Sequence, residues 1–232
     1  MKPPSPAGSA FYICGLIALF AILTVGVARA NVISYSTTTG LLPTDWSAPL
    51  SFSQFDPALG TLTQVQVSLD SSSFVDVAAE NLAAMPGSVA FNDAVGVTVD
   101  GLGLTPLFTL SLVAVGQQNF GPFDGTVDFA GTSGFTWPTI QTDGSLSDTW
   151  TSGFGAFSGL SVLGFLASST ATNTLSGSAG VISSLDTDSC ATLTVVYTYT
   201  PANVPDSLST VGALTVAVGL LGLLRRWLTQ AV

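Results

Sequence analysis

Histidine is absent from this chain of 232 residues, and lysine and arginine together number only four, against 14 aspartates and glutamates. The four cations, Lys2, Arg29, Arg225 and Arg226, all lie near the chain ends. The long central region, residues 31–204, therefore holds 13 carboxylates and no basic side chain. Nucleic-acid binding is excluded for this region, because it requires Lys or Arg to neutralise phosphates.

The same absences exclude several kinds of catalytic centre. Without histidine there is no imidazole base, so neither a Ser-His-Asp triad nor a Cys-His pair can form, and no metal can take a histidine ligand. Without lysine in the central region there is no Schiff base. The G-x-S-x-G nucleophile motif is also absent. Carboxylates alone suffice for glycoside hydrolysis, but spacing singles out no pair of them, and we expect a protein that is not an enzyme.

Cysteine is scarce as well, since Cys14 and Cys190 are the only two. Cys14 lies in the apolar N-terminal segment, so removal of that segment leaves one thiol and no internal disulfide. We expect Cys190 to be a small buried residue at the start of the last strand. An intermolecular disulfide and a reactive thiol are the alternatives.

Residues 1–30 have the three parts of a secretory signal peptide. Lys2 supplies the positive n-region, residues 11–27 supply the apolar h-region, and Ala28 and Ala30 form a small-x-small cleavage site. An uncleaved membrane anchor is the alternative, because the apolar run is about as long as a short span. The cleavage pattern, followed by polar Asn31, favours removal of the segment and export of the protein.

Residues 204–232 carry a second apolar segment. A 17-residue apolar run at 208–224 would form a helix that rises about 25 Å, close to the thickness of the hydrocarbon core. Arg225 and Arg226, which follow the run, lie at the cytoplasmic end of this helix by the positive-inside rule. This orientation places residues 31–203 outside the membrane. The short motif before the run is Val204, Pro205, Asp206 and Ser207, and the pair after it is Arg225 and Arg226.

This order of motif, glycine-rich helix, arginine pair and chain end resembles the PEP-CTERM class of bacterial sorting signals. The motif at 204–207 is similar to the VPDSG-CTERM variant, although Leu208 stands where that variant has Gly. The resemblance implies that an exosortase-type membrane transpeptidase recognises the motif, that 208–224 is a temporary anchor, and that Arg225 and Arg226 are the membrane stop. It also implies a link to exopolysaccharide or biofilm.

Between the two ends, residues 31–203 have the pattern of β-strands. Apolar and polar residues alternate over 64–69 and over 95–99, as in half-buried strands, and Asp-Pro, Pro-Gly and Asp-Gly pairs mark turns between the runs. Residues 107–115 are apolar on both faces, as in a central strand. These features predict an all-β domain, a two-sheet β-sandwich of the jelly-roll kind.

The predicted strands are short and no long helix is expected, although residues 80–84 have the composition of a single helical turn. The expected strands cover residues 33–37, 50–55, 64–69, 74–79, 87–91, 95–99, 107–115, 126–131, 160–167 and 193–199.

Four phrases of the central region resemble the choice-of-anchor domains that precede PEP-CTERM tails, the E type in particular. They stand at residues 54–62, 80–81, 127–131 and 196–199, so the likeness spans about 33–200. The resemblance implies display outside the cell and no reaction.

Two aspartate pairs form the tightest carboxylate clusters, Asp186 with Asp188 and Asp124 with Asp128. Ca²⁺ takes six to eight oxygens, so an Asp-rich loop outside the cell can hold one. The alternative is that these are solvated turn residues, since neither pair matches an EF-hand loop. We therefore expect no cofactor, with calcium as the alternative.

Three hypotheses for function follow. In the first, the chain is an exported, non-enzymatic β-sandwich, sorted from an inner-membrane-anchored precursor to the cell surface or extracellular matrix. Its partners would be an exosortase-type enzyme, the membrane and exopolysaccharide. In the second it is a calcium-assisted glycan-binding module, with Trp46, Trp137 and Trp150 either stacking on sugar rings or lying in the core. In the third it is a glycosidase that uses carboxylates alone.

Overall fold

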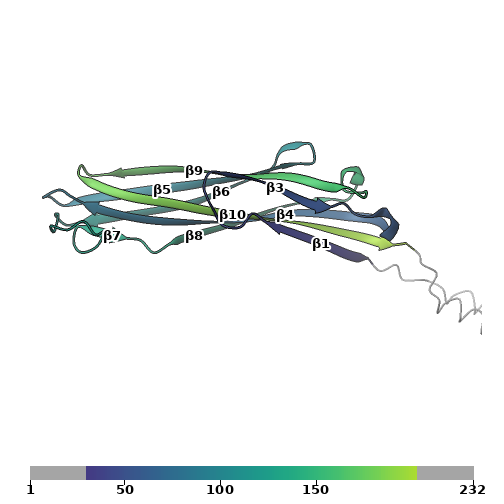
Figure 1. Cartoon of the computed structure of the whole chain (residues 1–232), viewed down its shortest axis with the longest axis horizontal. Coiled ribbons are helices and arrows are strands. Elements are labelled where there is room, and N and C mark those ends of the chain that lie inside the picture. The colour runs from purple at the N-terminus through teal and green to yellow at the C-terminus, as the bar shows by residue number, and fades with distance from the viewer. Residues whose placement is uncertain (1–29, 203–232) are drawn as a thin grey trace, which may run out of the picture.

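A computed structural model describes residues 30–202, which form an elongated two-sheet β-sandwich (Figure 1). The predicted signal peptide, with its Ala28 cleavage position, and the predicted sorting motif and membrane helix lie outside the described residues. Within residues 30–202 no helix is long and apolar enough to cross a membrane. The elements are β1 (Asn31–Thr38), β2 (Leu42–Pro43), β3 (Trp46–Ser53), η1 (Pro57–Leu59), β4 (Gly60–Asn81), β5 (Gly87–Gly101), β6 (Leu104–Phe120), β7 (Gly134–Thr136), β8 (Ile140–Trp150), η2 (Phe154–Ala156), β9 (Val162–Gly177) and β10 (Val181–Pro201).

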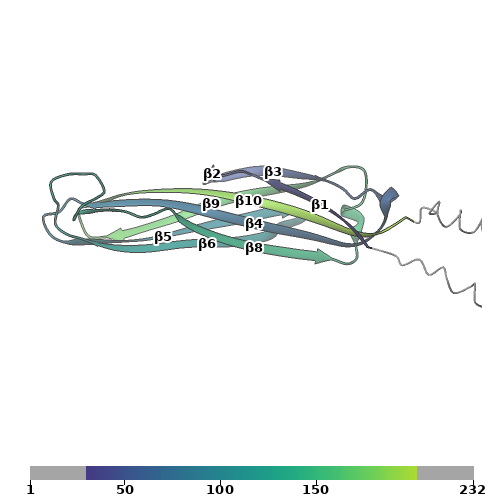
Figure 2. The ribbon, with the colours of Figure 1, turned by 90° about the horizontal axis from the view of Figure 1, so that it is seen from below.

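Two antiparallel sheets build the sandwich, each with four main strands. Sheet A has the order β1-β10-β4-β8, and the short strands β2 and β7 pair with β10 and β4. Sheet B has the order β3-β9-β5-β6. Figure 2 shows the strands of the two sheets stacked in pairs, β1 on β3, β10 on β9, β4 on β5 and β8 on β6. The predicted two-sheet β-sandwich is confirmed.

The central strands of sheet A are unusually long. β4 has 22 residues and β10 has 21, which at about 3.3 Å per residue gives a rod of roughly 70 Å. Asn31 pairs with Tyr199, so the first and last described residues leave the rod at the same end (Figures 1 and 2). We call this the base. The opposite, distal end is made by the turns at 82–86 and 178–180 and by the loop at 121–133.

Several predicted elements need correction. The strands expected at 64–69 and 74–79 are one strand, β4, and those at 87–91 and 95–99 are both in β5. The strand expected at 126–131 is wrong, because these residues form the loop between β6 and β7. The helical turn expected at 80–84 is also wrong, since β4 continues to Asn81 and a bend follows.

Strand β6 lies at an edge of sheet B and not at its centre. The apolar residues on its two faces have different surroundings. On the inward face Phe108, Leu112 and Ala114 are buried between the sheets, whereas on the outward face Val113 and Val115 are 48% and 64% exposed. The expectation of a central strand at 107–115 is therefore wrong.

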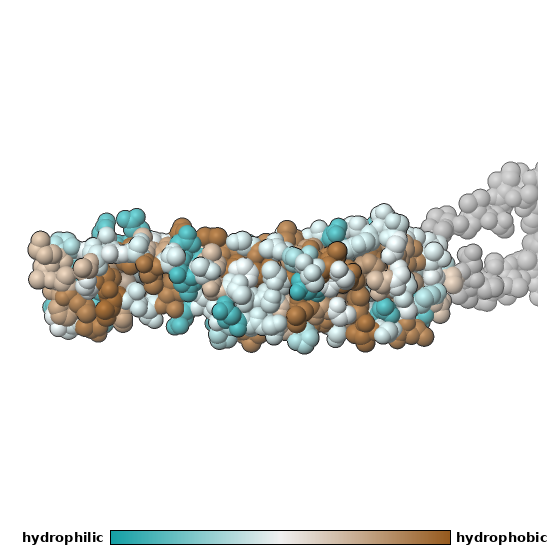
Figure 3. All heavy atoms as spheres, turned by 90° about the horizontal axis from the view of Figure 1, so that it is seen from above, coloured by the Kyte–Doolittle hydropathy of each residue, from teal (hydrophilic) through white to brown (hydrophobic). Residues whose placement is uncertain are grey.

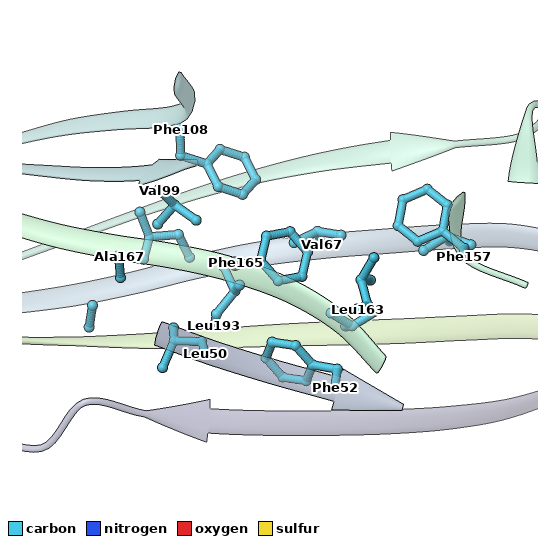
Figure 4. Close-up of a cluster of buried hydrophobic side chains, with 14 of the residues drawn as sticks. Leu50, Phe52, Val67, Val99, Phe108, Phe157, Leu163, Phe165, Ala167 and Leu193 are labelled. Atoms are coloured by element: carbon cyan, nitrogen blue, oxygen red, sulfur yellow. The ribbon is translucent and has the colours of Figure 1, made fainter. Parts of the chain in front are cut away.

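The largest part of the core fills the half of the sandwich near the base (Figure 4). Alternate residues of β4, β5, β9 and β10 point inward there and are almost fully buried, as the period of two requires. Phe165 packs edge-to-face on Phe52, with ring centroids 5.7 Å apart. Tyr197 donates its hydroxyl to the carbonyl of Ser53 at 3.0 Å, and burial, followed by the nearby Tyr35, raises the pKa of Tyr197 to about 12.

A layer of polar side chains interrupts the core midway along the rod. On four strands the inward residues change at the same level from Val, Leu or Ala to hydroxyl or carboxyl side chains, and apolar residues resume beyond on β4 and β5. Two contacts in this layer join the sheets: Ser169 and Ser189 hydroxyls lie 2.8 Å apart, and Thr187 donates to Asp93 Oδ1 at 3.2 Å. We call the layer the polar belt; its buried members are Ser71, Ser73, Asp93, Ser169, Thr187 and Ser189.

Candidate functional site

The outer face of sheet A carries a shallow polar groove between β10, β4 and β8. Register places Cys190 beside Ser72 and Ser72 beside Asp143, while Asp70 lies beside Ser145 in the next row. The groove has a volume of about 370 Å³. A second hollow of about 260 Å³, lined by glutamine, serine and aspartate side chains, shares Asp70 and Ser145 with it, so the two are continuous along β4 and β8.

The chemistry of the groove is that of a hydrogen-bonding surface. Ser72 donates to Asp143 Oδ1 at 2.6 Å, and the Gln141 amide donates to the same carboxylate at 2.9 and 3.2 Å. These bonds, that of Ser72 first, hold the pKa of Asp143 below its usual value. Asp143 is thus an acceptor at neutral pH and not a general acid, which requires a raised pKa. No aromatic ring lines the groove.

Cys190 lies in the middle of β10 with its side chain on the outer face, half-buried in this groove. The expectation of a buried residue at the start of the last strand is therefore wrong in both respects. β10 begins nine residues earlier, at Val181, so that Cys190 falls among the outward-pointing residues of the strand. Its thiol is free in the described structure.

Asp186 and Asp188 both lie on the outer face of β10, as two residues separated by one in a strand must. They lie within a strand and not in a loop, which corrects the predicted setting. Asp186 is directly opposite Asp76 of β4, a neighbour that sequence distance conceals, and Thr139 donates to Asp76 at 2.6 Å.

Asp124 and Asp128 share the loop at 121–133, at the distal end. Each carboxylate accepts hydrogen bonds from its own loop: Asp124 Oδ1 from the backbone and hydroxyl of Thr126, both at 3.1 Å, and Asp128 Oδ1 from the backbone of Ala130 at 3.0 Å. The backbone bond of Thr126, followed by its hydroxyl, lowers the pKa of Asp124. Within residues 30–202 no three carboxylate or thiol side chains come together as a metal site, so the two predicted aspartate pairs do not combine.

The tryptophans of the domain pack inward. Trp46 donates its indole N–H to Ser189 of the polar belt at 2.8 Å. Trp137 packs edge-to-face on Phe91 and Phe135, and Trp150 lies against Phe157. None of these three side chains presents a free face on which a sugar ring could stack. Of the two interpretations, stacking on sugars and packing in the core, the structure supports packing in the core.

Two buried carboxyl groups were not singled out from the sequence, Asp93 and Glu80. Asp93 is 1% exposed and Glu80 is fully buried. Both oxygens of Glu80 and Oδ2 of Asp93 lack a hydrogen-bond partner. Burial, only partly offset by the bond from Thr187, raises the pKa of Asp93. The burial of Asp93 could have been predicted from the sequence. Asp93 stands two or four positions from Val89, Phe91 and Val95, so it points to the same inward face of β5.

The outer face of sheet B differs from that of sheet A. Figure 3, which shows the molecule from above Figure 1, has apolar patches scattered among polar residues. Outward-pointing Val113, Val115, Val162 and Leu166 are among the exposed apolar side chains. Asp100 is the one carboxylate among the outward-pointing residues of β5, β6 and β9. The acidic character of the described domain is thus concentrated on sheet A and at the distal end.

No family model matches the chain, and no curated protein does. Among solved structures, the chain is similar to the infectious bursal disease virus VP2 subviral particle, at 11% identity and a TM-score of 0.21, with 75% of this chain and 37% of that chain covered. It is also similar to the turnip yellow mosaic virus structure, at 13% identity and a TM-score of 0.21, with 77% and 99% covered. The chain therefore spans little more than a third of the first, and likenesses this low carry no argument about function.

Proposed function

We propose that this chain is an exported, non-enzymatic β-sandwich of jelly-roll type, displayed at the cell surface or in the extracellular matrix through a C-terminal sorting signal. Two sheets of four main strands each, with the chain passing repeatedly from one sheet to the other, support the jelly-roll type. The proposal rests on the arrangement of the ends. Apolar segments and all four cations flank the domain in the sequence, and the two ends of the domain lie together at the base.

In this proposal the motif Val204–Ser207 is recognised by an exosortase-type enzyme, 208–224 holds the precursor in the inner membrane, and Arg225 with Arg226 stops the chain at its cytoplasmic face. A sandwich whose ends both leave at the base is suited to such a tether. One end is released by signal cleavage near Ala30, and the other remains bound to the membrane while the rod points away from it.

Changing both Arg225 and Arg226 to alanine is expected to disturb sorting, because the helix loses its stop and its orientation bias. An epitope inserted at Gly103, a turn position with open surroundings, allows the protein to be followed by fractionation and by protease protection of intact cells. We expect the double variant to accumulate unprocessed. Replacing both arginines by lysine keeps the charge and is the matched control, which should be processed normally. Normal processing of the alanine variant would contradict the proposal.

The lining of the groove supports non-enzymatic display. It combines hydroxyls, an amide and carboxylates. The pKa of Asp143 is lowered, which does not suit a general acid, and the carboxyl whose pKa is raised, Asp93, faces the interior. A glycosidase requires both a carboxylate and a carboxylic acid at the same bond.

A second candidate function, glycan binding, is favoured by the same groove. Its hydroxyl, amide and carboxylate groups match the hydroxyls of a sugar chain. Because the domain carries 13 carboxylates and no cation, it repels acidic polysaccharides, so neutral or amino-bearing glycans are the expected class.

The glycan hypothesis predicts that the paired change of Asp70 and Asp143 to alanine removes retention on such glycans. The two carboxylates stand on adjacent strands along the groove. The matched control changes Thr109 and Ser111 to alanine on the exposed face of β6 and should leave binding unaltered. A glycan array read with both variants is the measurement, and equal binding by the two would contradict a role for the groove.

A further inference from the structure

Glu80 occupies an unexpected position for a carboxylate. Strand alternation places it on the outer face of sheet A, since Val77 and Ala79 point inward. It is nevertheless fully buried, because β7 pairs beside it, with Gly134 directly opposite, and the loop leading into β7 lies over both residues. A Cβ at Gly134 would collide with Glu80 Oε2 and with the backbone of Phe129 and Ala130. The carboxylate is therefore in direct contact with this loop.

Nothing in the described structure compensates the charge of Glu80. Neither of its oxygens has a hydrogen-bond partner, and residues 31–202 contain no Lys, Arg or His. A buried carboxylate without a partner is strongly unfavourable, and buried charges in proteins are paired or bind metals. Salt bridges, the usual solution, are unavailable to this domain.

The covering loop carries the kinds of oxygen that a hard cation binds. Its residues 124–130 contain two carboxylates, and each uses Oδ1 for its own loop. Asp124 directs Oδ2 toward Gly131, 2.5 Å from the position of a Cβ there. The backbone of the loop turns back on itself, with Gly134 N–H donating to the carbonyl of Ala130 at 2.9 Å. Ca²⁺ is coordinated by such mixtures of carboxylates, backbone carbonyls and water.

We propose that Glu80 and the loop at 121–133 form a Ca²⁺ site at the distal end of the rod. Glu80 is the buried anchoring ligand, and loop carbonyls, a loop carboxylate and water complete the coordination. Ca²⁺ is favoured over Mg²⁺, because Mg²⁺ requires near-octahedral geometry and loses its waters reluctantly, whereas Ca²⁺ accepts irregular protein oxygens. The proposal does not depend on export or on the sorting signal.

The test is a thermal titration of the full-length chain purified in detergent at pH 7. CaCl₂ or MgCl₂ is added after EDTA treatment, at constant ionic strength, so that screening is the same throughout. We expect Ca²⁺ alone to raise the melting temperature by several degrees, with the rise growing as the logarithm of free Ca²⁺ above Kd. Isothermal titration calorimetry should give one site per chain.

Two variants assign the site. Glu80→Gln should lose the Ca²⁺ response and, in EDTA, should melt above the natural chain, because an unpartnered charge has been removed. The matched control, Asp186→Asn with Asp188→Asn, removes two carboxylates from the face of sheet A and should keep the full response. Three outcomes would overturn the proposal: equal responses to Ca²⁺ and Mg²⁺, a Ca²⁺ response that survives Glu80→Gln, or no Ca²⁺ response in the natural chain.

Discussion

Replacing Phe165 by alanine is expected to lower the free energy of unfolding by about 3–5 kcal/mol, the range for removal of a buried phenylalanine side chain. Phe165 is 4% exposed and lies between the sheets at the centre of the main cluster (Figure 4). Its ring contacts Phe52 edge-to-face and covers Gly101 of β5, where a Cβ would collide with it. The neighbouring strands are held by long ladders and cannot close the gap, so a cavity remains.

For a chain of this size the loss corresponds to a fall in melting temperature of roughly 6–20 °C, measured by circular dichroism or calorimetry. Leu166→Ala is the matched control. It removes a comparable side chain from the next position of β9, but Leu166 points outward and is 46% exposed, so we expect a change below about 1 kcal/mol. Similar losses for both variants would mean that the core is not arranged as described.

Asp93→Asn is expected to stabilise the protein at neutral pH by about 1–3 kcal/mol, because it removes a negative charge whose burial is only partly compensated by one hydrogen bond. Asp93 belongs to the polar belt, and its one hydrogen bond, from Thr187, is one that an asparagine oxygen can also accept. The other carboxylate oxygen has no partner, and no cation exists in the described residues to compensate it. The substitution removes the charge and retains the shape.

The pH dependence follows from the direction of the pKa shift. Burial raises the pKa of Asp93 in the folded state, so the folded protein binds this proton more tightly than the unfolded chain does. The contribution of Asp93 to stability is therefore most favourable below the pKa of the unfolded chain, about 3.9. It declines as pH rises to and through the folded pKa. The natural protein and Asp93→Asn should converge near pH 3 and diverge toward pH 7.

Asp100→Asn separates this effect from general charge repulsion. Both substitutions remove one negative charge from β5, but Asp100 lies on the outer face. Urea denaturation of the three proteins at pH 3, 5 and 7 is the measurement. An equal gain for both variants at pH 7 would attribute the effect to net charge and not to burial.

The strand pattern of this fold is largely predictable from the sequence, whereas the strand lengths, the long strand β8 and the short strands β2 and β7 are not. Alternation at 64–69 and 95–99 located β4 and β5, but serines on the inward side of β4 broke the apolar pattern and split one strand into two. β8 is not predicted, because its inward side has only three apolar residues, Ile140, Leu146 and Trp150, separated by polar residues and by Asp143-Gly144, which is typical of a turn. Gly144 is needed there for packing, since a Cβ would press on Leu110 and Leu112 of β6.

The groove on sheet A and the proposed site at Glu80 both depend on the register of the strands, which cannot be read from the sequence. Asp70 and Asp143 are 73 positions apart, and only the pairing of β4 with β8 places them in one groove. Strand alternation predicts that Glu80 is exposed on the outer face of β4. It is buried because the loop at 121–133, which the sequence does not place, lies over it. By contrast, the common face of Asp186 and Asp188 follows from spacing alone.

The position of β10 determines how the rod responds to mechanical load. Any pull on the chain beyond Pro201 enters the domain along β10, which is hydrogen-bonded to β4 from Val181 to Pro201 and to β1 from Thr192 to Tyr199. Antiparallel ladder bonds lie perpendicular to the strands, so this pull shears many of them at once instead of opening them one after another. A strand held on both sides in this way resists extraction, and drag acting on the far end of the rod is shared across the sheet.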